Sequence, residues 1–438
     1  MSLVRERKWL TAGLAVLAFG VGVPTLAQQQ APGAAQGAQP PPGVQQQRRG
    51  GGGGGGRPQT QPLGDGPWDF TTEQGRIHVT VVTKGLERPW GMALLPNGDM
   101  LVTERPGRLR IVRGGALDPT PITGMPKIRA VVIGGLQDVV LHPNFERNRL
   151  VYFSYSKPDE KDETLSTLAV ARGRFDGNAA LTNVEDIFVA KDWYSSAMAG
   201  QNMRCCGQGP ADASFGARMA FGRDGMLYVA SGDRNWGEKA QDPSSHLGKI
   251  IRVRDDGRVP RDNPFAGREG YLPEIFTLGH RNPTGLTLNP STGELWSTEF
   301  GPRGGDELNR IEAGKNYGWI LVTHGNHYNN EPVVRGAEGV PGMTDPELYW
   351  APSTNPGNIV FYTGDELPGW RGSLLLAAMS RALVRISFDS AGKPVAQELL
   401  LRDLGQRFRD VREGPGGVVY LLTDETAGAM LKVEGQSP

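Results

Sequence analysis

Two arginines, Arg407 and Arg409, stand one residue apart in a stretch that reads as a β-strand. Because successive side chains of a strand alternate between its two faces, both guanidinium groups lie on one face. Guanidinium groups bind carboxylates through charge-assisted hydrogen bonds, so this face suits a ligand that carries several carboxylates. The alternative is a pair of exposed strand arginines without a ligand.

The chain has two cysteines, Cys205 and Cys206, and they are adjacent. In an oxidising compartment they can form only a vicinal disulfide or links between molecules. A vicinal ring is strained, and strained disulfides are the more easily reduced ones. Three roles stay open for this pair: a staple for its own loop, a stacking platform for a ligand, or a redox-active couple.

Oxygen-rich loops around Asp262 and Glu299 are candidates for calcium, which takes about six to eight hard oxygen ligands. The alternative for both loops is an acidic surface turn. Other chemistry has no clear motif, because the sequence lacks a P-loop, a Rossmann-type glycine motif and a hydrolase triad in a known order.

Composition excludes several classes of protein. The 438 residues carry 47 Lys and Arg and 47 Asp and Glu, so the formal net charge is zero, and we expect no nucleic-acid partner. A hydrophobic fraction of 38% is too low for a protein with many membrane spans. Two cysteines are too few for a disulfide-stapled scaffold.

The N-terminal part reads as an export signal followed by a linker. A basic start precedes an apolar stretch from Trp9 to Ala27 that ends on small residues. We predict a signal peptide over residues 1–27, with a membrane anchor as the alternative. The mature protein is then periplasmic or secreted and has no membrane span. Residues 28–66, rich in Gln, Pro and Gly, predict a disordered tether.

One phrase recurs in residues 67–438: a few apolar residues, a turn of Pro, Asn, Asp or Gly, and a strong strand. Its six copies start at Gly91, Asp138, Arg218, Gly285, Ile359 and Asp410. Each copy predicts a hairpin, and further strands lie between the copies. Two hairpins per repeat make a four-stranded blade. We therefore predict an all-β fold, a six-bladed β-propeller of four-stranded antiparallel blades, with a β-sandwich or two β domains as the alternative.

Three segments carry a family resemblance: GHRNPTGLTLNP at 279–290, EFGPRGGDELNRIEAGKNYGW at 299–319 and AQDPSSHLGKIIRV at 240–253. They closely resemble the soluble PQQ-dependent glucose/sorbosone (aldose sugar) dehydrogenase family, of which the chain looks like a divergent member. The resemblance implies a periplasmic six-bladed propeller that holds pyrroloquinoline quinone (PQQ) with Ca²⁺ at the mouth of its central channel. It also implies oxidation of aldose hydroxyls to lactones by hydride transfer to the quinone.

The same resemblance implies roles for single residues. It places Ser214 where the family has its catalytic His, and serine has no pKa near neutrality with which to act as a base. Arg234 and Asn235 match a family turn and are candidates for contact with substrate or cofactor. Arg407 and Arg409 match the Arg-x-Arg that the family uses against its cofactor.

Other matches and departures follow from the alignment. Trp350 and Ser353 match an aromatic and a hydroxyl residue that lie near the cofactor. The cysteine pair, in the loop ahead of the expected base, joins the cofactor-binding candidates. Ile133 stands where the family has a Gln, and Met379 where it has a Lys, so two polar contacts are expected to be lost.

The sequence is compatible with three functions. The first is a periplasmic quinoprotein dehydrogenase, a monomer or homodimer, which oxidises a sugar or a related alcohol or aldehyde and passes electrons to a periplasmic acceptor. The second is a calcium-dependent lactonase-type hydrolase on the same fold. Its marks would be channel residues such as Asp212, Asp233, Asn235 and Asn355. The third is a binding propeller that has lost PQQ, because fold alone does not decide function.

Overall fold

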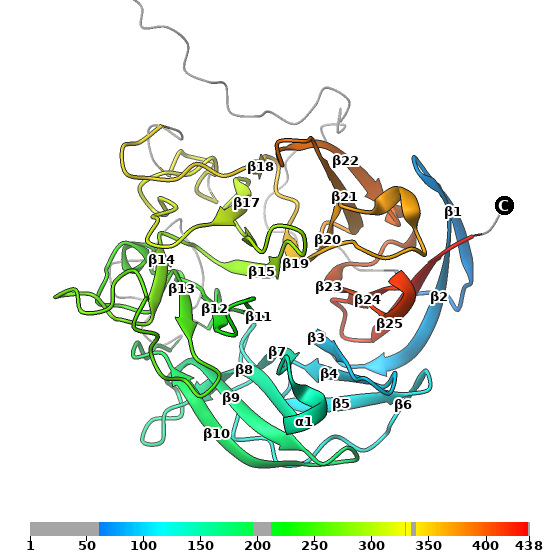
Figure 1. The fold of residues 1–438 in the computed structure, drawn as a ribbon, viewed down its shortest axis with the longest axis horizontal. Helices are drawn as coiled ribbons and strands as arrows, with labels where there is room; N and C mark the ends of the chain where they lie inside the picture. The colour runs from blue at the N-terminus through cyan, green and yellow to red at the C-terminus, as the bar shows by residue number, and fades with distance from the viewer. Residues whose placement is uncertain (1–60, 196–211, 329, 334–338, 437–438) are drawn as a thin grey trace, which may run out of the picture. The chain divides into compact units, whose positions relative to one another are not determined.

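The computed structural model describes residues 61–195, 212–328, 330–333 and 339–436. Their strands form six antiparallel sheets, which follow one another around a ring (Figure 1). The predicted all-β, six-bladed propeller is confirmed. The expected signal peptide, most of the expected tether and the Cys205–Cys206 pair lie outside the described residues. No helix in the described ranges is long and apolar enough to cross a membrane.

The blades are numbered in chain order. The strands of blades 1 to 3 are β3 (Pro89–Leu94), β4 (Met100–Glu104), β5 (Arg108–Arg113), β6 (Ala116–Leu117), β7 (Leu136–Leu141), β8 (Leu150–Pro158), β9 (Ser166–Phe175), β10 (Leu181–Val189), β11 (Gly216–Phe221), β12 (Leu227–Ser231), β13 (Lys249–Val253) and β14 (Ile275–Leu278). Those of blades 4 and 5 are β15 (Pro283–Leu288), β16 (Leu295–Glu299), β17 (Asp306–Ile311), β18 (Leu348–Trp350), β19 (Pro356–Phe361), β20 (Leu374–Ala378), β21 (Ala382–Phe388) and β22 (Pro394–Leu400). The short helices are α1 (Phe145–Asn148) and 3₁₀ turns at Gly237–Ala240, Pro368–Trp370, Arg402–Leu404 and Pro415–Gly417.

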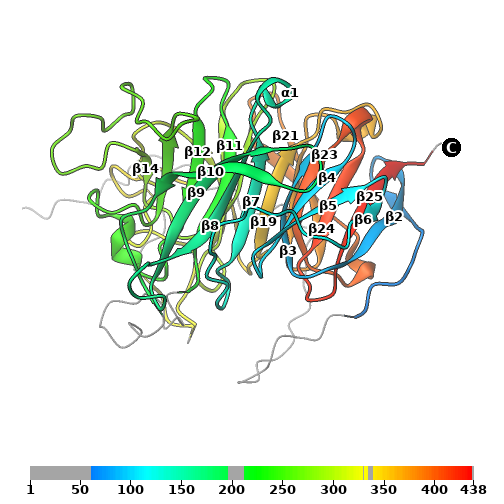
Figure 2. The ribbon, with the colours of Figure 1, turned by 90° about the horizontal axis from the view of Figure 1, so that it is seen from below.

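Blade 6 is built from both ends of the propeller. Its strands β23 (Phe408–Glu413), β24 (Val419–Thr423) and β25 (Gly428–Gly435) are joined by β2 (Gly75–Leu86) and then β1 (Trp68–Thr72). β2 pairs antiparallel with β25, as Figure 2 shows from below. This sheet therefore has five strands, one more than the predicted four, and it closes the ring.

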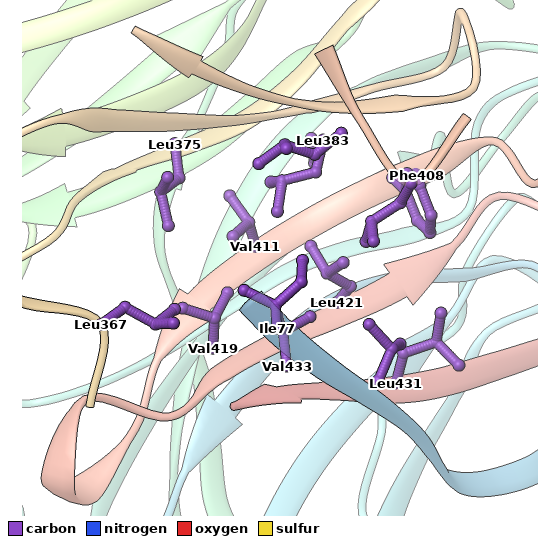
Figure 3. Close-up of a cluster of buried hydrophobic side chains, with 14 of the residues drawn as sticks. Ile77, Leu367, Leu375, Leu383, Phe408, Val411, Val419, Leu421, Leu431 and Val433 are labelled. Atoms are coloured by element: carbon purple, nitrogen blue, oxygen red, sulfur yellow. The ribbon is translucent and has the colours of Figure 1, made fainter. Parts of the chain in front are cut away.

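Each copy of the repeated phrase begins in the innermost strand of a blade: β3, β7, β11, β15, β19 or β23. These inner strands contact one another in sequence around the ring. Apolar side chains fill the space between neighbouring blades, where their burial stabilises the ring. One such cluster joins blade 6 to blade 5 (Figure 3) and includes Ile77, Leu375, Leu383, Phe408, Val411, Val419, Leu421, Leu431 and Val433.

A buried ion cluster links three inner strands. Arg218 of β11 contacts Asp138 of β7 (Nη1–Oδ1, 2.9 Å) and Asp410 of β23 (Nη1–Oδ1, 3.2 Å). Arg412 contacts the same carboxylates at 3.0 and 3.2 Å. The side chains of Arg218 and both aspartates have no exposed surface. We call these four residues the hub.

The same level of the ring also joins blades through backbone amides. The amide of Met92 donates to the hub aspartate of blade 6 (2.9 Å), and the amide of Met219 donates to the hub aspartate of blade 2 (2.8 Å). In blade 5, Asn358 accepts a hydrogen bond from the amide of Leu286 in blade 4 (3.3 Å). A hydrogen bond from a backbone amide to a side-chain oxygen therefore links three pairs of neighbouring inner strands.

We predict that Arg218→Met destabilises the protein by about 3–5 kcal/mol, because it leaves two buried carboxylates to share the guanidinium group of Arg412. Arg258→Met is the control, since Arg258 is an exposed partner of Asp256 and its loss should leave the unfolding midpoint within error. Urea unfolding followed by circular dichroism measures both variants. Equal midpoints for the two would contradict the importance of the hub.

Candidate active site

A cavity of about 640 Å³ lies at the starts of the inner strands. In all six blades the pairing between the inner strand and its neighbour is irregular at this end, for example between Leu136 and Val139. Irregular pairing of this kind turns side chains in new directions and is common beside active sites. The second residue of four inner strands lines the cavity: Trp90, Gln137, Thr284 and Arg409.

The hub supports this end of the cavity. Asp138 follows Gln137 directly in β7, and Asp410 follows Arg409 in β23. The hub arginine of blade 3 lies 4.1 Å from the ring centroid of Trp90, which also lines the cavity. Residues that are fixed by buried ion pairs therefore lie next to residues whose side chains line the cavity.

Four guanidinium groups line the cavity, from Arg105, Arg281, Arg407 and Arg409, and the described part of its wall has no Asp, Glu, Lys or His. Arg407 and Arg409 each contact Asp424 at 2.8 Å. Burial alone would raise the pKa of Asp424, but the two guanidinium groups lower it below its usual value. One carboxylate thus holds two cations in place, and the described wall keeps an excess of positive charge that suits an anionic ligand.

The other two arginines are held by backbone carbonyl groups. Arg281 Nη1 donates to the carbonyl oxygen of Gly301 (2.7 Å), and Arg105 Nη2 donates to that of Val132 (2.8 Å). Val132 has a φ of 56°, a strained conformation for a β-branched residue. Strain of this kind persists where surrounding contacts impose it, and it is common at ligand-binding sites.

Ser214 and Asn235 form a pair in the cavity wall. Ser214 Oγ donates to Asn235 Oδ1 (2.9 Å), and both residues are buried with positive φ angles of 50° and 61°. The hydroxyl proton of Ser214 is thus directed to a carboxamide oxygen. Because a carboxamide does not take up a proton near neutral pH, this pair can orient a hydroxyl group of a ligand but offers no general base.

Arg234 lies behind the wall and does not line the cavity. Its guanidinium group is 3.7 Å from the ring centroid of Phe215, which does line it, and it donates to the carbonyl oxygen of Ser166 (3.2 Å). Burial lowers the pKa of Arg234 to about 9, although Asp212 lies 3.8 Å away. The structure places this predicted contact residue as a support for Phe215.

The remaining cofactor candidates are separated by the structure. Ser353 lines the cavity, and its hydroxyl group donates to Asp306. Trp350 does not line it, because its indole Nε1 donates to Gln397 (2.7 Å) between blades 4 and 5. Trp350 and Ser353 are thus close in sequence, but only Ser353 reaches the cavity.

The two calcium candidates lie apart from each other and from the cavity. Glu299 is buried, and its carboxylate accepts hydrogen bonds from His280 (2.8 Å) and from the amide of Arg281 (2.6 Å). Asp262 is exposed and pairs with Arg252 (3.1 Å). Within the described ranges, no three His, Cys, Asp or Glu side chains are placed to hold a metal ion.

Three carboxyl groups lie behind the wall, and of these Asp233 and Asp306 are buried while Glu307 is half-buried. Burial raises the pKa of Asp306 to about 6, although the hydroxyl group of Ser353 donates to it. Burial raises the pKa of Asp233 to about 6 as well. Burial and the neighbouring charge of Glu299 raise the pKa of Glu307 well above its usual value.

The family assignment rests on the matched span. The chain matches the family model described as Glucose / Sorbosone dehydrogenase over residues 86–432. This span contains every described residue that lines the cavity. The chain belongs to the glucose/sorbosone dehydrogenase family. The resemblance drawn from the three sequence segments is confirmed.

Individual relatives agree with this assignment. The aldose sugar dehydrogenase YliI of Escherichia coli is 38% identical to the chain, and the match covers 82% of this chain and 92% of that protein. A crystal structure of a glucose dehydrogenase is 42% identical, with a TM-score of 0.75, and covers 82% of this chain and 99% of that one. The PQQ-bound form of an aldose sugar dehydrogenase from Streptomyces coelicolor is 26% identical, with a TM-score of 0.64, and covers 82% and 98%.

At three positions this chain is expected to carry another residue than the rest of the glucose/sorbosone dehydrogenase family, and all three positions lie in the wall of the cavity. Ser214, Ile133 and Met379 line the cavity. The polar side chains of the wall that sequence reasoning missed include Arg105, Gln137, Arg281 and Asn282. The last two lie in the segment 279–290 that carried the resemblance, so the motif itself was the available signal.

Stability should fall as the pH rises from about 4 to about 6.5. The raised pKa of Asp306 means that the folded protein favours the protonated carboxyl group, so its stabilisation is complete below about pH 4 and is lost as the pH passes about 6. We predict that Asp306→Asn reduces this loss by about 1–3 kcal/mol. Urea unfolding of both proteins at several pH values measures the difference. An identical pH dependence would show that Asp306 is ionised in the folded protein throughout.

Proposed function

We propose that this chain is a PQQ-dependent dehydrogenase that oxidises an aldose sugar, or a related alcohol or aldehyde, in the periplasm. The observation that carries the proposal is the group of four arginines around one cavity whose described wall has no carboxylate. The names of relatives support it, since one is an aldose sugar dehydrogenase and another is a PQQ-bound form of such an enzyme.

The residues present fit the cofactor. PQQ is a planar aromatic quinone with three carboxylates, and the cavity has the size of an ordinary ligand site, about 300–1,000 Å³. The guanidinium groups suit its carboxylates, while Trp90, Phe215 and Met379 offer apolar surface to its ring. When bound, PQQ supplies the acceptor for a hydride.

The protein supplies position and charge. Ser214 Oγ donates its proton to Asn235, so its lone pairs remain for a hydroxyl group of the substrate. Arg281, held on the carbonyl oxygen of Gly301, keeps positive charge beside that pair in the wall. No described residue of the wall can take up a proton near neutral pH, so we expect proton removal to limit the rate.

Calcium, the electron acceptor and the assembly complete the proposal. Neither Asp262 nor Glu299 is placed to bind calcium at the cavity, so the hard donors available there are carbonyl and amide oxygens of the wall. Electrons would leave to a periplasmic acceptor, after export directed by residues 1–27. The protein would act as a monomer or a homodimer.

One alternative retains support from the site. A binding propeller that holds an anionic ligand without turnover would explain why the described wall has cations but no base. The hydrolase is less favoured, because Asp212 and Asp233 do not line the cavity and Asp212 pairs with Arg129 (2.7 Å). Asn235 and Asn355 line it, but neither can act as a base.

We predict that the mature protein binds PQQ, with calcium present, and that Arg409→Gln raises the dissociation constant by about 10- to 100-fold, since a charge-assisted contact is lost. Quenching of tryptophan fluorescence measures this, because Trp90 lines the cavity. Arg172→Gln is the control, since Arg172 pairs with Glu185 on an outer part of blade 2. Absence of PQQ binding at micromolar concentration would exclude the proposed dehydrogenase.

A second prediction concerns the missing base. Ser214→His should raise the rate of dye reduction with aldoses by about 100-fold or more, because it restores an imidazole to the wall. His is among the residues that tolerate the positive φ of this position. Ser214→Ala brings no base and removes the hydroxyl group that can orient the substrate, so its rate should be no higher than that of the wild type. An unchanged or lower rate for the His variant, with PQQ still bound, would favour the binding propeller.

A further inference from the structure

Gln137 is a buried residue with an unused hydrogen-bonding group. It is the second residue of β7, is 2% exposed, and lines the cavity. Its Oε1 is buried and has no hydrogen-bond partner among the described residues. Natural proteins pair nearly all of their buried polar groups. As placed, Oε1 is closed to solvent, so a ligand in the cavity would reach it after a rotation about the side-chain torsion that ends in the carboxamide, a torsion with broad preferences.

The backbone at Gln137 is fixed, so the carboxamide cannot leave the cavity by a shift of the chain. The backbone carbonyl oxygen of Gln137 accepts a hydrogen bond from the hydroxyl group of Thr103 in blade 1. The next residue, Asp138, is held by Arg218 and by the amide of Met219. The backbone of Gln137 is thus held by blade 1 on one side and by the hub through Asp138 on the other.

Two other carboxamides of the wall already have protein partners. Asn235 Oδ1 accepts from Ser214 (2.9 Å), and Asn282 Oδ1 accepts from the amide of Gly216 (3.0 Å). These two amides hold the wall together. Gln137 makes no such bond through Oε1. We therefore distinguish it from the two asparagines, whose amides serve the structure of the wall.

We propose that the carboxamide of Gln137 binds PQQ at the hub side of the cavity. This proposal rests on the proposed function. A carboxamide offers both an acceptor and donors, and PQQ carries a pyrrole N–H group as well as carbonyl and carboxylate oxygens. Ile133, where the resemblance leads us to expect a Gln, lines the same cavity four residues earlier. The chain therefore presents the amide from β7 in place of one from the preceding loop.

Gln137→Leu tests the proposal without any measurement of activity. We expect the dissociation constant for PQQ to rise about tenfold, while the melting temperature of the cofactor-free protein stays equal or rises, because an unpaired polar group has been replaced by an apolar one. Gln397→Leu is the matched control. Gln397 accepts from Trp350 Nε1 (2.7 Å), so its loss should lower the melting temperature and leave PQQ binding unchanged.

The outcomes separate the two proposals. Tight PQQ binding by the wild type with the same dissociation constant for Gln137→Leu would overturn the role of Gln137 alone. A lower melting temperature for cofactor-free Gln137→Leu with unchanged affinity would show that the amide is structural, and would overturn it too. No PQQ binding by the wild type would overturn the proposed function and with it the assigned ligand.

Discussion

The buried contact of Arg218 with Asp138 and Asp410 imposes a constraint that runs through the whole ring. Charges without access to water need all of their partners together, because one unpaired buried charge costs several kcal/mol. Three strands that are far apart in sequence must therefore meet at one level. Gln137 and Arg409 directly precede the two aspartates, so the ion cluster that orders the blades also places two groups of the cavity wall.

The fold was predictable because its signals are local. Each repeated phrase encodes an inner strand, a turn and a second strand within about twenty residues, and hairpin and turn chemistry act at that range. Closure of the ring was not predicted. It depends on the pairing of β2 with β25, for example Val79 opposite Val433, and no local pattern marks two strands at opposite ends of the propeller as partners.

The site was predictable only where a side chain's direction follows from strand alternation. Arg407 and Arg409 share one face and both line the cavity, as their spacing indicates. The irregular strand pairing at this end of the blades breaks simple alternation elsewhere. Arg234 lies in the turn after β12 and outside any strand, so alternation says nothing of its direction, and its place behind an aromatic ring needed the structure. Gln137 could not be singled out from the sequence, because only the structure shows that its Oε1 is buried without a hydrogen-bond partner.

The pairing of β2 with β25 also has a consequence for the order in which the fold can form. β2 precedes every other strand of the six blades except β1, and β25 follows all of them, so the ring can close only after the last of these strands has been made. Until then one edge of β2 has no partner, and an open strand edge invites association with other chains. Contacts of such long sequence separation also form slowly. The hairpin of β24 and β25 therefore has a second role besides completing blade 6, because it covers the edge that β2 leaves open.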